Sequence, residues 1–235
     1  MSPLVAQLEV FPDAIRFVVD NASFVAEKTV EHLVLSGAAI GISILVAIPL
    51  GVWLGHIHRG SFLAITVGNL GRALPSLALI AFGLPIFGIS FTNVLLALVV
   101  LAVPPMLTNA YTGVDQVDRD VVDAARGMGM SGWQVLRRIE LPLALPLLFA
   151  GIRTSSVYVI ATATIAAIAG GGGLGDIIVN QASYRLEGVI GAALCVSLLA
   201  LIVDALLALA QRSVTPPALR RGNAAVPPAV APGAG

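Results

Sequence analysis

The sequence predicts an all-α fold, a polytopic bundle of about five to six membrane-spanning helices. Of the 235 residues, 57% are hydrophobic and only 11% are charged, whereas average soluble proteins carry roughly 25% charged residues. The mean hydropathy of +0.95 also indicates an integral membrane protein. The apolar residues gather in long runs with few charges, as membrane spans require.

Several apolar runs reach the length of about 20 residues that a helix needs to cross a bilayer. The first uncharged run extends from Leu33 to Gly55, and between Gly60 and Val114 the only charge is Arg72, so two spans fit there. Turn residues predict a break between these two over 83–90. Because the fourth stretch is long, the count stays open between five and six. The expected spans are 33–55, 62–82, 91–112, 143–169 and 188–211.

The two ends of the chain differ from this membrane domain, which we place at 33–211. Residues 1–32 carry five acidic and two basic side chains and read as an amphipathic extracytoplasmic segment at the membrane surface. This composition does not fit a signal peptide, so the first span is expected to stay in the membrane. Residues 212–235 are rich in Pro, Ala and Gly and are expected to be a disordered cytoplasmic tail.

Small residues recur four apart at Gly37/Gly41 and Gly51/Gly55 in the first span. Such spacing lets helices approach closely in lipid.

The distribution of basic residues predicts the orientation, because loops rich in Lys and Arg stay in the cytoplasm. One set of connections carries eight basic residues and the other carries three. The rule therefore places the segment 115–140 and the C-terminus in the cytoplasm, and the N-terminus outside. The eight are Arg59, Arg119, Arg126, Arg137, Arg138, Arg212, Arg220 and Arg221, and the three are Arg16, Lys28 and Arg185. His56 and His58, beside Arg59, are expected to be solvated at the cytoplasmic surface.

The polar segment 115–140 predicts two short helices. Acidic residues at the start of the first suit the positive end of a helix dipole, and Gly127 or Gly129 can end it in a left-handed cap. Ser131 followed by Gln134 forms the pattern of a capping box for the second helix, which Pro142 is expected to stop. With its small side chains, the segment forms a compact knob suited to a groove on a partner in the water.

This knob resembles the EAA motif of permease subunits of bacterial ABC importers, in which an acid-Ala-Ala triplet, a Gly and Ile-x-Leu-Pro recur at fixed spacings. All spacings match here, with Asp in place of the usual Glu. The resemblance implies a type I ABC importer permease fold in which the loop 115–142 docks on a separate ATPase. The coupling residues that it implies are Asp123, Ala124, Ala125, Gly127, Met128, Gly129, Ile139, Leu141 and Pro142.

Further stretches are similar to the osmoprotectant branch of these permeases, which import glycine betaine, choline, carnitine or proline betaine. They include Asn69-Leu-Gly-Arg72-Ala-Leu-Pro75-Ser76, Ala150-Gly-Ile-Arg153 and Gly170-Gly171-Gly172-Gly173. The resemblance implies a second permease, identical or homologous, two ATP-binding cassette subunits that bind the ATP, and an extracytoplasmic substrate-binding protein. It also places the four glycines, expected to be flexible, near the outer gate.

Three charges fall within the expected spans, at Arg72, Arg153 and Asp204. A charge at mid-bilayer costs roughly 2.5–3.5 kcal/mol, so each should face protein or water. A salt bridge of Asp204 with one of the arginines and a lining of the pathway are both open at this point. We predict an intramembrane ion pair of Arg153 with Asp204. Arg72 would then line the translocation pathway with Asn69, Pro75 and Ser76, and Pro75 would kink its helix.

Other classes of function fit the sequence less well. The chain has no Gly-x-x-x-x-Gly-Lys loop to bind ATP, no metal-ligand spacing and no nucleophile with a base, so we expect neither cofactor, metal nor enzymatic activity of its own. A net charge of zero argues against nucleic acid as a partner. The alternatives are an importer permease for another small solute, such as an amino acid or methionine, or an ion-coupled secondary transporter.

Overall fold

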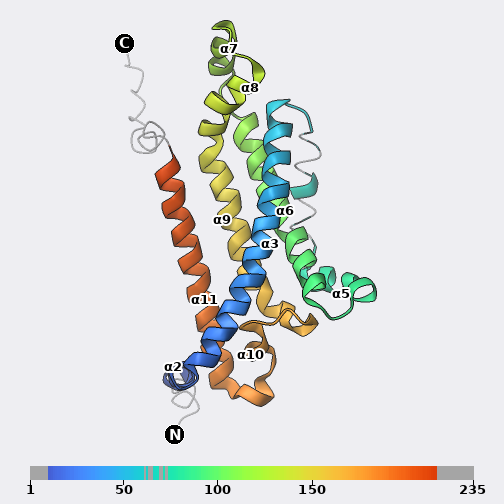
Figure 1. Ribbon diagram of the computed structural model, residues 1–235, viewed down its shortest axis with the longest axis vertical. Helices are drawn as coiled ribbons and strands as arrows, with labels where there is room; N and C mark the ends of the chain where they lie inside the picture. The colour runs from blue at the N-terminus through green and yellow to red at the C-terminus, as the bar shows by residue number, and fades with distance from the viewer. Residues whose placement is uncertain (1–9, 61, 63–65, 69–70, 72–73, 216–235) are drawn as a thin grey trace, which may run out of the picture.

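The fold is a bundle of long helices (Figure 1), seen in a computed structural model that describes residues 10–60, 62, 66–68, 71 and 74–215. These ranges contain helices and turns and no strand. In chain order the helices are α2 (Val10–Asp20), α3 (Ala22–His56), α5 (Ser76–Phe87), α6 (Phe91–Asp115), α7 (Arg119–Gly127), α8 (Gly132–Val135), η1 (Leu136–Glu140), α9 (Leu141–Ala166), η2 (Ala167–Ala169), α10 (Gly175–Val179) and α11 (Gln181–Val214).

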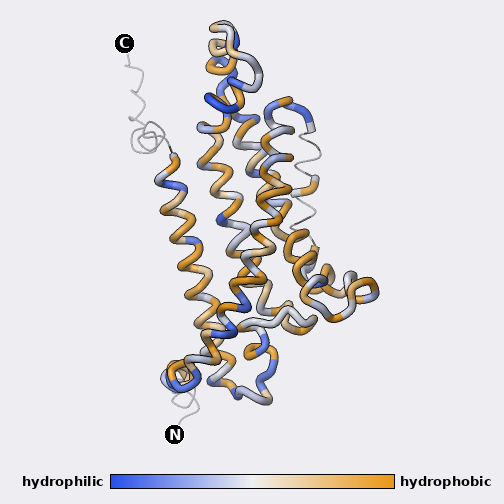
Figure 2. The backbone as a smooth tube through the Cα atoms, viewed as in Figure 1, coloured by the Kyte–Doolittle hydropathy of each residue, from blue (hydrophilic) through white to orange (hydrophobic). Residues whose placement is uncertain are grey.

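Four helical stretches in the described ranges are long and apolar enough to cross a membrane: α3, α6, the continuous run Gly132–Ala169, and α11. The shorter α5 is also apolar. Figure 2 shows apolar residues along the long helices and polar residues concentrated at α2, at the α7–α8 tip and in the turns. The all-α membrane bundle expected from the sequence is confirmed.

Helix α3 packs against α6 with its backbone almost in contact at two glycines. A Cβ atom added to Gly51 would lie 2.6 Å from the Cβ of Ala110, and one added to Gly55 would lie 2.8 Å from the carbonyl oxygen of Tyr111. Because no larger side chain fits there, these glycines set the distance between the two helices. Gly37 and Gly41 have no neighbour within 4 Å of such a Cβ, so the close packing expected from their spacing is not formed within the described chain.

The central core lies between α3, α6 and α9, where Leu35, Leu98 and Val159 are fully buried. At one end of the bundle, α2 and the start of α3 pack against α11. Gly191 of α11 would place a Cβ atom 2.9 Å from Val18, and Tyr184 stacks on Phe24 with ring centroids 5.7 Å apart. Residues 22–32, expected to belong to the surface segment, instead form the beginning of α3.

The observed elements differ from the predicted ones at three places. Helix α5 passes through Gly83 and Pro85 and ends at Phe87, so the break is confined to the turn at Gly88, whose φ is +65°. Helix α11 begins at Gln181 but has a non-helical residue at Arg185, close to the predicted start of the last span.

The third difference is at Pro142, which does not stop the helix after the polar segment. The chain passes from α8 through the π-helical turn η1 into α9, and Pro142 lies in the first turn of α9. In η1 the N–H of Leu141 donates to the carbonyl of Leu136, five residues back. The wider turn allows the chain to continue, and a proline near a helix start costs no hydrogen bond of that helix. The final tail beyond residue 215 lies outside the described residues.

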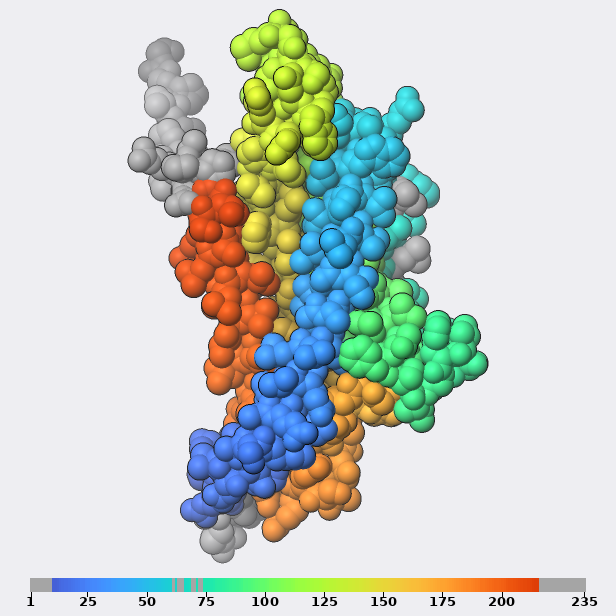
Figure 3. Space-filling view, in the orientation of Figure 1, coloured from blue at the N-terminus to red at the C-terminus, as the bar shows by residue number. Residues whose placement is uncertain are grey.

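The α7–α8 tip projects at the end of the bundle opposite α2 and α10 (Figures 1 and 3). Helix α6 has 25 residues, a length of about 37 Å. Residues just before α6 and residues in the tip should therefore lie on opposite sides of a membrane.

Single cysteines test this topology. In a Cys195→Ala background, Ile89→Cys precedes α6 and Met128→Cys lies in the tip; the native side chains are 74% and 76% exposed, so both thiols should be accessible. An impermeant maleimide added to sealed right-side-out vesicles should label Ile89→Cys at least tenfold more than Met128→Cys, with equal labelling after permeabilisation. Labelling of both from outside would contradict the arrangement.

Candidate functional site

Local capping holds α7 at the start of the tip. The side chain of Asp118 accepts the N–H of Asp120 at 2.9 Å, which satisfies a free donor at the helix start. Gly129, two residues after the helix, has a φ of +85°, and its N–H donates to the carbonyl of Arg126. Gly129 therefore ends α7 in the left-handed conformation predicted from the sequence, which favours glycine.

The second tip helix begins with the predicted capping box. The Ser131 N–H donates to Oε1 of Gln134 at 2.8 Å, and the Gln134 N–H donates to Oγ of Ser131 at 3.4 Å. These reciprocal bonds fix the chain where it turns from α7 into α8. The two helices of the polar segment are thus confirmed.

A small hydrophobic core joins the two tip helices. Ala125 and Val135 are buried in it with Val122, and Ile139 packs against it. Ala125 is only 1% exposed, so among the small residues of the motif this one lies inside the tip. Its small side chain instead allows α7 and α8 to pack together.

Most of the other coupling residues fall into two groups, one exposed on the tip and one at the start of α9. Asp123, Ala124, Gly127, Met128 and Gly129 are exposed at the tip. Leu141 and Pro142 are partly buried at the start of α9, where Leu141 packs on a cluster that includes Ala144. Trp133, in α8, is an exposed aromatic side chain of the tip.

Two histidines contact carboxylates at the two ends of the tip, Asp115 before α7 and Glu140 after α8. The sequence did not reveal these contacts. Nδ1 of His56 lies 2.6 Å from Oε2 of Glu140, and Nδ1 of His58 lies 3.0 Å from Oδ1 of Asp115. Neither histidine is freely solvated, because their side chains are 19% and 21% exposed. The expectation that they are solvated is therefore wrong; the partners lie more than 50 residues away along the chain, where no local spacing signals them.

Arg153 of α9 and Asp204 of α11 lie together in a two-pronged contact. Nε of Arg153 donates to Oδ1 of Asp204 at 2.8 Å and Nη2 donates to Oδ2 at 2.9 Å. Nη1 donates to Gln211, whose side-chain amide donates to the carbonyl of Pro146. This chain of contacts ties α9 to α11. All three guanidinium nitrogens of Arg153 have a partner within the protein.

The two largest of the cavities that border α9 share part of their lining. One of about 610 Å³ is lined by Arg153, Asp204, Thr154 and Tyr158, among others. Another of about 290 Å³ has a more polar wall that includes Asn109, Thr154 and Tyr158. Tyr158 and Thr154 therefore border both spaces.

The predicted pathway residues fall in a region that the structure describes in part. Asn69 and Arg72 lie outside the described residues. Pro75 precedes α5 with extended backbone angles, and Ser76 is the first residue of that helix. Pro75 therefore begins a helix and does not kink one, which corrects the prediction.

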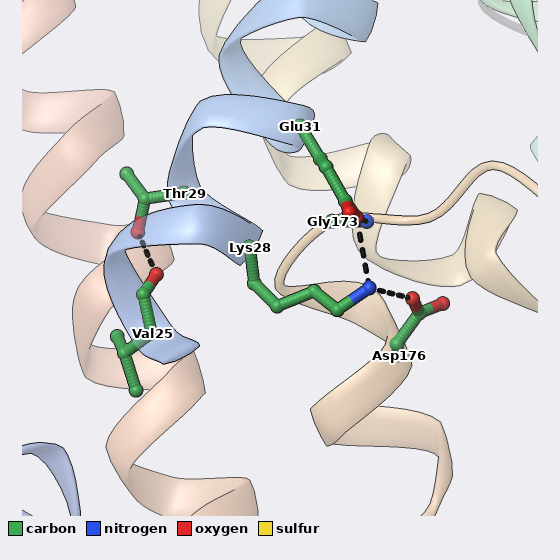
Figure 4. Close-up of polar contacts among 6 residues, drawn as sticks. All are labelled: Val25, Lys28, Thr29, Glu31, Gly173 and Asp176. Carbon is green, nitrogen blue, oxygen red and sulfur yellow. Dashed lines mark hydrogen bonds and ion pairs between the residues drawn. The ribbon is translucent and has the colours of Figure 1, made fainter. Parts of the chain in front are cut away.

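The four glycines Gly170–Gly173 form a compact turn beside the N-terminal part of α3. Gly170, Gly172 and Gly173 all have positive φ, so the run meets a conformational need of the backbone. Figure 4 shows the polar contacts around it: Oε2 of Glu31 accepts the N–H of Gly173 at 2.9 Å and also contacts Nζ of Lys28 at 2.9 Å. Nζ of Lys28 in turn lies 2.8 Å from Asp176, so α3 is tied to the loop and to α10.

The structure defines a class of protein: a multi-pass membrane subunit with a polar tip suited to a soluble partner. Within the described residues, no three His, Cys, Asp or Glu side chains converge on a possible metal site. The chain belongs to the family of binding-protein-dependent transport system inner membrane components, whose family model matches residues 47–216. It is therefore a permease subunit of an ABC importer in the inner membrane.

Relatives of known name cover most of the chain. It is 42% identical over 205 residues to the glycine betaine/carnitine/choline transport system permease protein OpuCB of Bacillus subtilis, covering 87% of this chain and 94% of the relative. It is 37% identical over 217 residues to the osmoprotectant import permease protein OsmW of Salmonella typhimurium, covering 88% and 100%.

Solved structures share the fold at lower identity. The inward-facing MetNI methionine ABC transporter matches with a TM-score of 0.71 at 20% identity, over 82% of this chain and 96% of that one. An amino acid ABC transporter with histidines matches with a TM-score of 0.67 at 20% identity, over 83% and 96%. At this identity the likeness shows the fold.

The contact between α9 and α11 can be tested by unpairing it. Asp204→Asn leaves the Arg153 guanidinium without its charged partner and should cost about 1 kcal/mol at this partial exposure, a fall of about 2–4 °C in the melting temperature in detergent. The double variant Arg153→Gln/Asp204→Asn should recover most of this loss. A double variant that melts no higher than the less stable single would show that the pair does not stabilise the fold.

Proposed function

We propose that this chain forms the translocation pathway of an importer for osmoprotectants of the quaternary-amine class, such as glycine betaine and choline. The observation that carries the proposal is the similarity over 87% of the chain to a permease named for glycine betaine, carnitine and choline. The cargo of that relative is here assigned to this chain as a hypothesis. The same machine with an amino acid or methionine as cargo is the second candidate, because its solved relatives carry those solutes in their names.

The α7–α8 tip is the surface that we assign to the ATPase. It is polar, internally capped and packed on its own small core, so it can transmit force as a unit. Exposed Met128 and Trp133 provide apolar contact area at its surface. In this proposal ATP binds to two partner ATPase subunits, and their closure draws two such tips together, with the tip and the C-terminus in the cytoplasm and the N-terminus outside.

A second permease copy, identical or homologous, completes the pathway in this proposal, and a separate extracytoplasmic protein captures the solute. The aromatic side chain available beside both cavities is Tyr158, whereas an aromatic cage for a quaternary ammonium needs several converging rings. We therefore assign high-affinity selection to the binding protein, and passage of the released solute to this chain.

Reconstitution tests the cargo. The permease, its ATPase subunits and its binding protein are placed in proteoliposomes, and uptake of radiolabelled glycine betaine and choline is measured with ATP inside. We expect uptake at least tenfold above that of liposomes loaded with a non-hydrolysable ATP analogue, and no uptake of methionine or histidine. Uptake of methionine or histidine alone, or uptake driven by an ion gradient without ATP, would contradict the proposal.

Gly127 allows a clean test of docking. A Cβ atom there meets nothing within 4 Å and its φ is not positive, unlike that of Gly129, where any substitution would also strain the backbone. Gly127→Trp should therefore leave the permease folded but obstruct a partner's groove, and lower both ATPase co-purification and uptake at least tenfold. The matched control Gly127→Ala should behave like the wild type. Normal co-purification and uptake with Gly127→Trp would exclude this surface as the docking site.

A further inference from the structure

Glu140 is a carboxylate with no exposed surface, at the point where the tip joins the bundle. Acidic side chains are almost never fully buried unless they are paired. Its Oε2 lies 2.6 Å from Nδ1 of His56, while Oε1 is buried without a hydrogen-bond partner among the described residues. The contact with His56 is therefore the interaction that compensates for burying this group.

The backbone around Glu140 is also unusual. Glu140 ends the π-helical turn η1, which joins α8 to α9. Such turns are rare and occur frequently at functional sites. One extra residue in a turn rotates the following side chains by about 100° around the helix axis. The turn therefore sets the side of the helix on which Glu140 lies, and it directs this carboxylate towards the end of α3.

His56 is the last residue of α3 and lies close to α8 as well. A Cβ atom added to Gly132, the first residue of α8, would be 3.5 Å from Nε2 of His56. The imidazole thus lies between the beginning of α8 and the end of η1. Two residues further on, His58 contacts Asp115, the last residue of α6, from which the chain leaves for α7.

We infer that His56 and His58 form a clasp that positions both ends of the tip segment, Asp115 and Glu140, and couples tip movement to α3. The clasp comprises His56–Glu140 and His58–Asp115. It rests on the proposed function, because the tip is assigned to the ATPase there. When the ATPase subunits draw the tip sideways, the two contacts carry that displacement into α3, which packs along α6 through Gly51 and Gly55. These four residues are positioning residues, and they contact neither solute nor ATP.

The readout is the number of solute molecules transported per ATP hydrolysed by the reconstituted complex. Glu140→Met keeps about the same side-chain volume, places an apolar group in the buried site and removes the polar contact. We expect it to lower this ratio at least fivefold while ATPase co-purification stays within twofold of the wild type. Glu140→Gln keeps a hydrogen-bonding group for His56 and should retain at least half of the ratio. The matched control Glu187→Gln lies at the start of α11, far from the tip along the chain, and should leave the ratio unchanged.

Further variants guard against loss of folding. His56→Leu/Glu140→Met replaces a buried polar pair with apolar groups, an exchange that proteins often tolerate, and should fold yet remain uncoupled. His58→Ala and Asp115→Ala remove partly exposed side chains together with their hydrogen bond and should lower the ratio two- to threefold. A wild-type ratio in Glu140→Met, in the double variant or in both His58→Ala and Asp115→Ala would overturn the clasp. So would a parallel fall of folded yield, ATPase activity and uptake in all variants, which would indicate stability alone. Because the wild-type complex is measured in the same assay, uptake by it supports the proposed function whatever the variants show.

Discussion

The close contact of α3 with α6 at Gly51 and Gly55 is the constraint on which the end of the bundle that carries the α7–α8 tip depends. With backbone atoms of α6 within about 3 Å of where side chains would begin, α3 ends beside the last turn of α6. That position brings His56 and His58 within hydrogen-bonding distance of carboxylates on both ends of the tip segment. A methyl group at either glycine would separate the two helices and move the histidines away from both partners at once.

The sequence predicts those parts of the molecule whose causes are local. The acid at a helix start, the Ser131–Gln134 capping box and the left-handed Gly129 each depend on a few neighbouring residues, and the structure has all three. The cost of an unpaired charge among apolar residues led to the pairing of Arg153 with Asp204, and the structure brings these side chains together. Four of the five spans predicted from length and hydropathy coincide with long apolar helices, with shifted ends, and the predicted span 62–82 falls partly outside the described residues.

The remaining features depend on contacts between distant segments or on backbone alternatives with similar local signals. Pro142 normally argues for a helix end, but a π-helical turn just before it lets the helix continue. His56 and His58 look like surface residues in a polar turn until α6 and η1 come next to them. Ala125 and Ala124 are adjacent and identical, and only the packing of α7 on α8 decides that one is buried while the other is exposed.

The packing of α2 on α11 has a consequence for how the chain is made. Helix α2 is synthesised well before α11, yet its partner surface, with Gly188 and Gly191 against Phe17 and Val18, belongs to α11. Until α11 has been made, the apolar face of α2 therefore lacks this packing partner. A chain halted before α11 would keep that face without its packing partner, so the two ends of the described bundle can be completed only together.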